Sequence, residues 1–557
     1  MRGKQVLLDT LLAHDVEHVF GNPGTTESPL LDALLDEPRL RYVLALHEGV
    51  ALGAAHHYAQ AAGRVGFVNL HVAPGLGNAL GMLYNAWEAC SPLVITAGQA
   101  DSRLLLREPL LAHDLVRMAE PLVKWSAQAE RGDDLALLLH RAFQTALEPP
   151  RGPVFVALPM DVLEQETENA ALPRSTVFRE ARPDPAGIEA AARVLAAAKA
   201  PVIVAGDGVT EGRANVDLLA VAELLGARLY HPGLHHHLAF PMAHPAARQR
   251  MPFDAEGIRR ELGDADAVLL VGGSFFEEIW YSPGSYFPTG ARVVQVEAVA
   301  SRLARNFAVD VGIAAPLGAT LHLLASAIAA AGGEELRAAA AARRVALHDE
   351  HAREVERQRQ RAAERHDRSP IAVTRLMREL AKALPDDAVV VNEAITASPD
   401  LLRAFGFERA HDYYGTRGGG IGQALPGALG VKLAHPQRPV VAVSGDGSAM
   451  YSIQALWTAA HHELAVLFVI LHNREYRVLK HNMDIYRKRF GVDPTRPYPH
   501  MDLDQPHLDF PALARSQGVD AAEVRDPAEL PAALERAFGA LATGRPYLLD
   551  VWIEGMG

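Results

Sequence analysis

The stretch Val440-Val-Ala-Val-Ser-Gly-Asp-Gly-Ser-Ala449 decides the fold of this chain. Its apolar first half predicts a buried β-strand, and Gly445 and Gly447 let the backbone turn sharply and approach a ligand closely. Ser448 is expected to open a helix whose free N–H groups face outward and can bind an anion. The strand therefore delivers the carboxylate of Asp446 to its carboxyl end, beside a predicted anion site.

A second apolar run, residues 464–472, predicts the next strand and leads to Asn473, 28 positions after Gly445. Because the carboxyl ends of parallel strands meet at one edge of a sheet, Asn473 and Asp446 are expected to lie together. Their oxygens and the backbone carbonyl of Glu475 suit a hard cation such as Mg²⁺, which keeps phosphate oxygens among its ligands. The unit thus predicts a site for a metal-bound diphosphate.

This spacing resembles the signature of thiamine-diphosphate enzymes, and the resemblance extends over essentially the whole chain. A second Gly-Asp-Gly, residues 206–208, has Leu234 at the equivalent spacing and no oxygen ligand there, so we interpret it as an ordinary strand-end turn. The resemblance implies thiamine diphosphate and Mg²⁺ as cofactors. The residues implied at the diphosphate end are Gly445, Asp446, Gly447, Ser448, Asn473 and Tyr476, with Asp446, Asn473 and Glu475 as metal ligands.

Composition agrees with an ordinary soluble globular protein. The chain has 557 residues, of which 49% are apolar and 22% charged, and its formal net charge is −13. The charge argues against a nucleic-acid partner, and no apolar run approaches the roughly 20 residues of a membrane span. The single cysteine, Cys90, excludes an internal disulfide, and the N-terminal stretch does not resemble a signal peptide. We therefore expect a cytoplasmic protein.

The chain is too long for one core and predicts an α/β fold with three doubly wound parallel-sheet domains. These are a pyrimidine-binding domain (1–180), a middle domain (181–345) and a diphosphate-binding domain (369–557), with a helical linker at 346–368.

Local patterns add detail within these domains. In the first domain a strand over 65–71, a turn over 73–78 and a helix over 79–90 repeat the layout around Gly445, which suggests duplication. Residues 334–368, rich in Ala, Arg and Glu, predict exposed helix and linker. Ser369-Pro370 predicts a helix start, with a serine N-cap and proline at the first helical position.

Glu48 is the candidate for activating the cofactor. It stands where a predicted strand runs into a helix of small residues, so its carboxylate is expected to be half-buried, which favours proton transfer near neutral pH. A plain helix N-terminal acid is the alternative interpretation. The resemblance implies that Glu48 contacts the aminopyrimidine ring and comes from a different subunit than the diphosphate motif. It thus implies a homodimer as the minimal active unit and a homotetramer as the assembly.

Other cofactor contacts are implied by matching segments. Thr396, after the strand at 388–391, would offer a hydroxyl to the diphosphate. Gly419 would supply a carbonyl to the aminopyrimidine, and Ile421 would support the bent cofactor, although core packing is a competing interpretation. Asn78 lies in the loop that resembles a histidine-bearing segment of the family.

Among family members, the resemblance is closest to the benzoylformate decarboxylases. It implies that Thr25 binds the substrate carboxylate and that His71 moves protons beside the reacting carbon. Their second active-site histidine is replaced here by Ile279, so one proton shuttle is missing. The residues implied in the substrate pocket are Leu110, Leu111, Ile279 and Val478.

Several cations follow the metal loop, namely Arg474, Arg477, Lys480 and His481. They predict either a solvated helix face or a substrate with an additional anionic group.

These observations predict a lyase that decarboxylates a benzoylformate-like 2-oxo acid and can pass the acyl group to an aldehyde, forming a 2-hydroxy ketone. Three alternatives stay open at this point. One is an acetolactate-synthase-like enzyme or an oxidase with FAD in the middle domain, although no flavin fingerprint is visible. Another is a 2-hydroxyacyl thioester lyase, and the third is a regulatory homologue that binds the cofactor without turnover.

Overall fold

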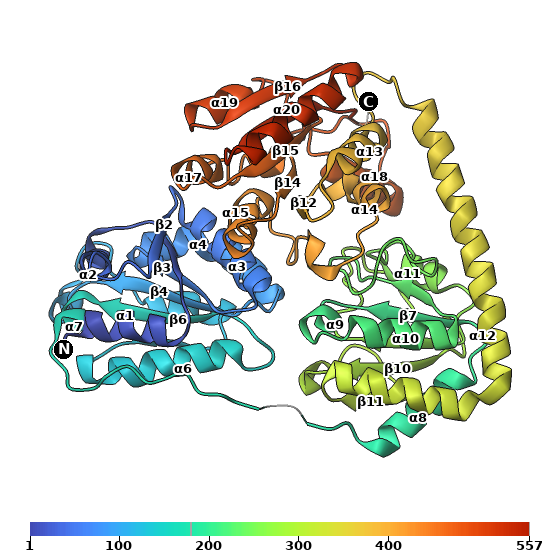
Figure 1. The fold of residues 1–557 in the computed structure, drawn as a ribbon, viewed down its shortest axis with the longest axis horizontal. Coiled ribbons are helices and arrows are strands. Elements are labelled where there is room, and N and C mark those ends of the chain that lie inside the picture. The colour runs from blue at the N-terminus through green and yellow to red at the C-terminus, as the bar shows by residue number, and fades with distance from the viewer. Residues whose placement is uncertain (179–180, 556–557) are drawn as a thin grey trace. The chain divides into compact units, whose positions relative to one another are not determined.

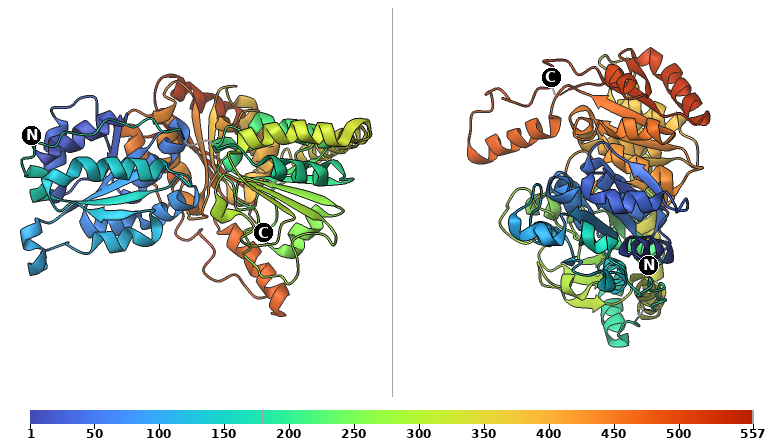
Figure 2. Two further views of the ribbon diagram at one scale, coloured as in Figure 1. Left: turned by 90° about the horizontal axis from the view of Figure 1, so that it is seen from below. Right: turned by 90° about the vertical axis from the view of Figure 1, so that its left-hand side faces the viewer.

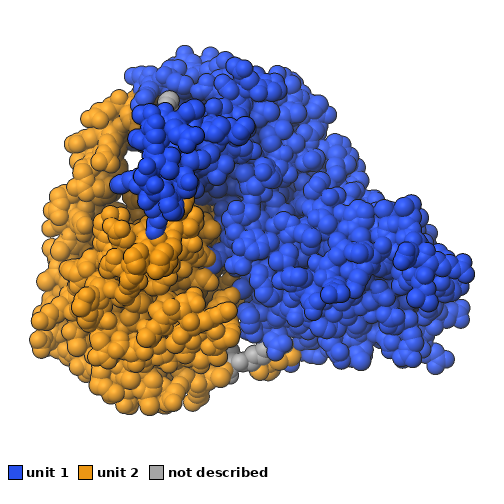
Figure 3. Space-filling model, turned by 180° about the vertical axis from the view of Figure 1, so that it is seen from behind, with its two compact units in different colours: residues 1–176, 367–398, 416–557 blue, residues 177–366, 399–415 orange. Residues whose placement is uncertain are grey.

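The computed structural model describes residues 1–178 and 181–555, which form two compact units (Figure 3). The first unit contains residues 1–176, 367–398 and 416–557, and the second contains residues 177–366 and 399–415. Every sheet within these units is parallel and is interleaved with helices, which confirms the predicted α/β class.

The N-terminal sheet of the first unit has the strand order β2-β1-β3-β4-β6-β5. Helices α1 (Gly3–Ala13) and α6 (Leu135–Leu147) cover one face, and α3 (Glu48–Ala62) and α4 (Val72–Glu88) cover the other (Figure 1). Because both faces are covered, the central strands are continuous apolar runs. The strands are β1 (His18–Gly21), β2 (Arg41–Leu44), β3 (Gly66–Leu70), β4 (Leu93–Gln99), β5 (Ser126–Gln128) and β6 (Val154–Pro159).

The C-terminal sheet of the first unit follows the same plan. Its order β12-β14-β15-β17-β16 parallels β1-β3-β4-β6-β5, in agreement with the duplication suggested by the sequence. Gly445 pairs with Leu471, so the residues that follow these two strands emerge at one edge of the sheet. The strands are β12 (Val389–Glu393), β14 (Val440–Gly445), β15 (Val466–His472), β16 (Asp520–Val524) and β17 (Tyr547–Trp552).

Two helices join the halves of the first unit, α3 and α15 (Ala424–Ala434). Glycines let their backbones approach closely. A Cβ on Gly430 would collide with the carbonyl oxygen of Ala54, and one on Gly427 would lie 2.8 Å from the ring of His57. The small residues of both helices are therefore required by this contact.

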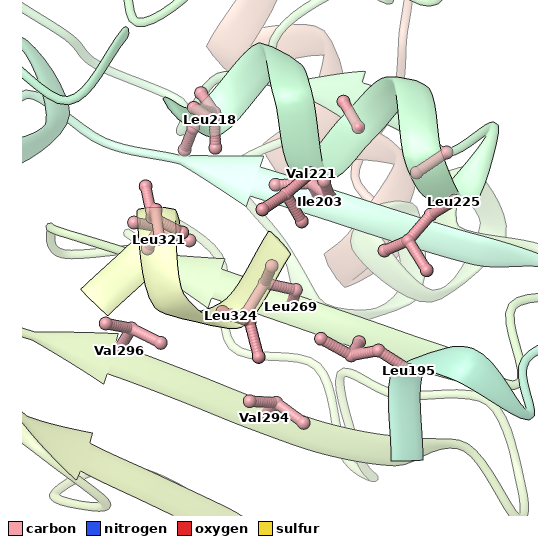
Figure 4. Close-up of a cluster of buried hydrophobic side chains, with 14 of the residues drawn as sticks. Leu195, Ile203, Leu218, Val221, Leu225, Leu269, Val294, Val296, Leu321 and Leu324 are labelled. Atoms are coloured by element: carbon pink, nitrogen blue, oxygen red, sulfur yellow. The ribbon is translucent and has the colours of Figure 1, made fainter. Parts of the chain in front are cut away.

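The second unit is a five-stranded doubly wound sheet of order β11-β10-β9-β7-β8. One face packs apolar side chains against α8 (Pro185–Ala196), α10 (Asn215–Leu225) and the start of α12 (Figure 4). The strands are β7 (Pro201–Ala205), β8 (Arg228–Tyr230), β9 (Ala267–Val271), β10 (Arg292–Glu297) and β11 (Val311–Ala314). Leu218, Val221 and Leu324 are among the fully buried side chains of this core.

Helix α12 (Leu317–Glu364) is 48 residues long and is kinked at Gly333, whose φ is 54°. Its second part confirms the helix predicted after residue 334.

The remaining elements are α2 (Ser28–Leu34), α5 (Leu115–Ala119), α7 (Met160–Glu164), α9 (Gly208–Glu211), α11 (Ala255–Leu262), α13 (Val373–Ala383), β13 (Tyr413–Tyr414), α14 (Ser398–Phe405), α16 (Asp446–Ala449), α17 (Ala455–His461), α18 (Arg477–Phe490), α19 (Phe510–Ser516) and α20 (Leu530–Ala542). No helix among the described residues is both long and apolar enough to span a bilayer.

The predicted turn at 73–78 is wrong, because helix α4 already begins at Val72. Pro74 is tolerated in the first turn, where backbone N–H groups lack helical partners anyway. Gly75 marks a close contact rather than a turn, since a Cβ there would lie 3.1 Å from Oε1 of Glu48.

Two predicted helix starts are also wrong. Helix α13 begins at Val373 rather than at Ser369-Pro370, because Ile371 first exchanges backbone hydrogen bonds with Trp552 and Glu554. The helix expected from Ser448 begins at Asp446 and ends at Ala449. The free backbone N–H groups of its first turn still lie directly after β14, where the anion site was predicted.

We predict that Gly430→Ala lowers the midpoint of thermal unfolding, because its Cβ has no space between α15 and α3; overpacking of this kind costs about 1–3 kcal/mol. Gly539→Ala in α20 is the matched control, since nothing lies within 4 Å of its Cβ. A glycine-to-alanine change in an open helical position is expected to stabilise by about 0.4–1 kcal/mol. Equal midpoints for the two variants in scanning calorimetry would contradict the role of the α3–α15 contact.

Candidate active site

Glu48 is the first residue of α3 and is buried, with 6% of its surface exposed. Its Oε2 accepts a hydrogen bond from Nδ2 of Asn78 at 3.0 Å, and its Oε1 accepts a long one from Asn22 at 3.4 Å. His47 caps the helix by accepting from the backbone N–H of Gly49. The carboxylate is thus held at a strand-to-helix junction by neutral side-chain amides.

His71 follows β3 directly, as the residue before α4, and faces an acidic partner that is absent from the predicted site residues. Its Nδ1 lies 2.8 Å from Oε2 of Glu27, which is only 1% exposed. Thr26 donates to the same carboxylate and lies 3.3 Å from Nδ1 of His71. Glu27 thus fixes the orientation of the His71 ring through Nδ1.

Two glycines explain why this cluster fits. A Cβ on Gly24 would collide with the ring of His71, and one on Gly98 would collide with Glu27. The sequence Asn-Pro-Gly-Thr-Thr-Glu contained a signal for Glu27. This acid stands two residues after Thr25, the residue predicted to bind the substrate carboxylate, and so lies on the same loop. Thr25 itself is exposed at the start of a 3-10 turn.

Asp446 lies at the carboxyl end of β14 with 2% of its surface exposed. Its Oδ1 accepts from the N–H of Gly447 at 2.8 Å and its Oδ2 accepts from the N–H of Arg474 at 2.6 Å. Burial raises the pKa of Asp446 above its usual value, and the two amides oppose the shift. Within the described part of the chain no cationic side chain pairs with this carboxylate, so a bound cation would offset its burial.

Asn473 follows β15 and brings its side chain to the same edge of the sheet, as predicted. Its Oδ1 accepts from the N–H of Glu475 at 2.9 Å, which folds the loop around it. Gly447 is required by Tyr476, because a Cβ would lie 2.5 Å from the tyrosine ring. The oxygen-rich donor set of Asp446 and Asn473 fits a hard cation.

The cations after this loop have structural partners. Arg474 lies over the ring of Trp552 at 5.0 Å, and Arg477 donates to the carbonyl of Glu554. Lys480 forms ion pairs with Glu475 and Asp502 at 2.5 and 2.6 Å. These three side chains therefore contact other protein groups and do not form a purely solvated helix face.

The glycine turn over residues 418–422 precedes α15 and adopts positive φ angles at Gly418, Gly419 and Gly422. Gly419 is exposed and Ile421 is partly exposed, so neither is core. Thr396 is exposed in the short 3-10 turn at Ile395–Ala397. These residues are available to a ligand at the end of the sheet.

The predicted pocket residues are unusually exposed for apolar side chains. Leu110 is 88% and Leu111 42% exposed in the first unit, and Ile279 is 59% exposed in the second. Val478 is partly exposed near the start of α18, a helix that extends away from the C-terminal sheet (Figure 2).

The site residues of the first unit thus form two groups. Glu48, Asn78 and His71 belong to the N-terminal half, and Asp446, Asn473 and Tyr476 belong to the C-terminal half. The hydrogen-bonding partners of Glu48 are Asn22 and Asn78, and those of Asp446 are Gly447 and Arg474. The two carboxylates share no partner among the described residues.

Three models of one protein family match the chain. The N-terminal TPP binding domain of thiamine pyrophosphate enzymes matches residues 1–118, the central domain matches 188–324, and the C-terminal TPP binding domain matches 397–551.

Individual proteins match over almost the full length. Benzoylformate decarboxylase of Pseudomonas aeruginosa is 35% identical, covering 98% of this chain and 97% of its own. Acetolactate synthase isozyme 3 large subunit of Escherichia coli is 28% identical over 100% of this chain and 95% of its own. The structure of the 4-hydroxybenzoylformate decarboxylase of Rhodococcus jostii RHA1 has a TM-score of 0.85 at 30% identity, covering 100% and 99% of the two chains. The chain therefore belongs to the superfamily of thiamine-pyrophosphate-dependent decarboxylases and acetolactate synthases.

Proposed function

We propose that this protein is a thiamine-diphosphate- and Mg²⁺-dependent carbon–carbon lyase that decarboxylates a 2-oxo acid. The observation that carries the proposal is the buried carboxylate of Asp446, which has two amide donors and, among the described residues, no lysine or arginine ion-paired with it. Placed at a sheet edge with Asn473, it suits a metal that carries a diphosphate.

The residues that would hold the cofactor lie at or near the sheet edge where Asp446 and Asn473 follow β14 and β15. Asp446, Asn473 and the Glu475 carbonyl would bind Mg²⁺. The backbone at Gly445, Gly447 and Ser448 and the hydroxyl of Thr396 would face the diphosphate, and Tyr476 would flank it. Bound thiamine diphosphate would supply a thiazolium carbon acidic enough to become a nucleophile, and a ring that accepts the electron pair left by CO₂.

Glu48 would exchange a proton with the pyrimidine ring nitrogen through its carboxylate. Hydrogen bonds from Asn22 and Asn78 would hold the carboxylate in place for this exchange. His71 would take and return a proton at Nε2, with Glu27 fixing the ring through Nδ1. Thr25 would donate its hydroxyl hydrogen to the substrate carboxylate.

The proposed substrate is a 2-oxo acid with an apolar, benzoylformate-like side chain. Leu110, Leu111 and Val478 of the first unit would offer it apolar surface. The names of the Pseudomonas and Rhodococcus relatives, a benzoylformate and a 4-hydroxybenzoylformate decarboxylase, support this choice. Because the chain has Ile279 where the benzoylformate decarboxylases that it resembles have a proton-moving histidine, transfer of the acyl group to an aldehyde, giving a 2-hydroxy ketone, is proposed as a second outcome of the reaction.

A homodimer is the proposed active unit, within a homotetramer. It is supported by the exposure of Leu106 and Leu110, at 100% and 88%, and of Phe490 on α18, at 62%. Exposed apolar patches on a protein surface mark sites that a partner covers. In a dimer the Glu48 group of one copy would complete the Asp446 group of the other.

Glu48→Gln is expected to lower kcat by about 10²–10⁴-fold, the usual contribution of a positioned proton-transfer group, measured as CO₂ release from benzoylformate. Binding of the cofactor with Mg²⁺ should change little, because the diphosphate end is untouched. Glu120→Gln, on the exposed 3-10 turn at Glu120–Leu122, is the control and should keep full turnover. Normal turnover in Glu48→Gln would overturn the assignment.

Asp446→Asn is expected to abolish the Mg²⁺-dependent rise in melting temperature that thiamine diphosphate produces. Stabilisation by a ligand reaches about 2.7 kcal/mol at one hundred times its Kd, so the loss is measurable by thermal shift. Asp207→Asn, in the other Gly-Asp-Gly, is the matched control. Asp207 accepts from the amides of His236 and His237, so this variant should retain the full cofactor response. A response lost in both variants or in neither contradicts the metal site.

Co-expression of Glu48→Gln and Asp446→Asn chains tests the dimer. If each site combines two subunits, half of the randomly formed dimers are mixed and each contains one intact site, so activity returns to about a quarter of the wild-type level. Sites built within one chain would remain inactive in the mixture. Each variant expressed alone provides the baseline.

A further inference from the structure

The turn over residues 418–422 needs external support to hold one shape. Gly418, Gly419 and Gly422 have φ angles of 82°, 78° and 94°, a region that glycine enters freely and also leaves freely. Under the proposed function this turn offers the Gly419 carbonyl and the Ile421 side chain to the ring end of the cofactor. A turn that had to be ordered on binding would reduce the affinity.

Glu393 supports the turn from the C-terminal sheet. It is the last residue of β12 and is 1% exposed. Its Oε1 accepts from the N–H of Gly422 at 2.6 Å and its Oε2 accepts from the N–H of Ala424 at 2.8 Å. Burial raises the pKa of Glu393 to about 7, and the amides of residues 422–424 oppose the shift. The carboxylate therefore binds the end of the turn and the start of α15 together.

Asn85 supports the turn from the other side. It lies on α4 and is fully buried. Its Oδ1 accepts from the N–H of Gly420 at 2.9 Å, and its Nδ2 donates to the carbonyl of Gly420 at 3.2 Å. A Cβ on Gly420 or Gly418 would lie 2.5 or 2.8 Å from Asn85, so the glycines are needed for this approach. Gln423 adds a hydrogen bond to the same carbonyl at 2.7 Å.

We propose that Glu393 and Asn85 are positioning residues that fix the 418–424 backbone in the shape that receives the pyrimidine ring of the cofactor before it binds. The inference rests on the proposed function. Neither residue contacts the metal loop in a hydrogen bond of the described structure, so both act on the ring end alone. The diphosphate end is held separately by Asp446 and Asn473.

This separation gives the test. Binding of thiamine diphosphate and of inorganic diphosphate, each with Mg²⁺ at pH 8, is measured by titration calorimetry for the full-length wild type, Glu393→Gln and Asn85→Ala. In Glu393→Gln the new side-chain NH₂ group faces the backbone N–H of Gly422 or of Ala424, so one hydrogen bond to the turn is lost. Loss of a hydrogen bond to a charged group weakens binding of the cofactor by about tenfold or more. We expect that loss for thiamine diphosphate, and a change of less than about twofold for inorganic diphosphate.

Two further variants separate a specific effect on the turn from a general loss of stability. Val390→Ala is the matched control, because Val390 is fully buried in β12 and its truncation weakens the core without touching the turn. It should leave the ratio of the two affinities unchanged. The double variant Glu393→Gln/Asn85→Ala should lose less than the sum of the single losses, since both residues hold one turn.

Equal weakening of both ligands in Glu393→Gln, or a ratio like that of Val390→Ala, would show a merely structural role and overturn the inference. Unaltered binding of thiamine diphosphate in both single variants would also overturn it. Failure of the wild type to bind thiamine diphosphate is a different result, because it rejects the proposed function itself.

Discussion

The close contact between α3 and α15 is the constraint on which the first unit depends. Gly53, Gly427 and Gly430 leave no room for larger side chains between the two helices. Glycine in a helix interior costs about 1 kcal/mol relative to alanine, and this cost is offset only where the backbones pack closely. Glu48 is the first residue of α3, and α15 begins directly after the 418–422 turn. The packing of one helix pair thus sets the position of an acidic side chain and of a glycine turn at once.

Buried carboxylates recur where strands or helices begin and end. Asp446 and Glu393 each accept two backbone hydrogen bonds, and burial raises the pKa of both. Glu48 is held instead by side-chain amides. Such groups are costly in a stable core and cluster at functional sites. Their hydrogen-bond donors are neutral amides, and among the described residues none of the three carboxylates forms an ion pair with a lysine or an arginine.

Much of this arrangement could be predicted from the sequence, because buried parallel strands are continuous apolar runs with glycine turns at their ends. The spacing of Asp446 and Asn473 was informative because adjacent strands deliver them to one edge. The turn expected at 73–78 failed because Gly75 provides space for Glu48, a requirement that local propensity does not contain. The role of Asn85 could not be found in this way either, since it arises from a contact with Gly420, 335 positions away. Glu27 stands two residues after Thr25 in the same loop, but local sequence does not contain its contact with His71, 44 positions away.

The shared strand order of the two sheets in the first unit has an evolutionary consequence. Helix α3 precedes β3 as α15 precedes β14, so equivalent helices of the two halves face each other across their contact. Equivalent surfaces packed together are the geometry of an isologous dimer. Fusion of two ancestral copies would turn a concentration-dependent association into a permanent one. The two halves would then be free to diverge, one toward a proton-exchanging acid and the other toward a metal site.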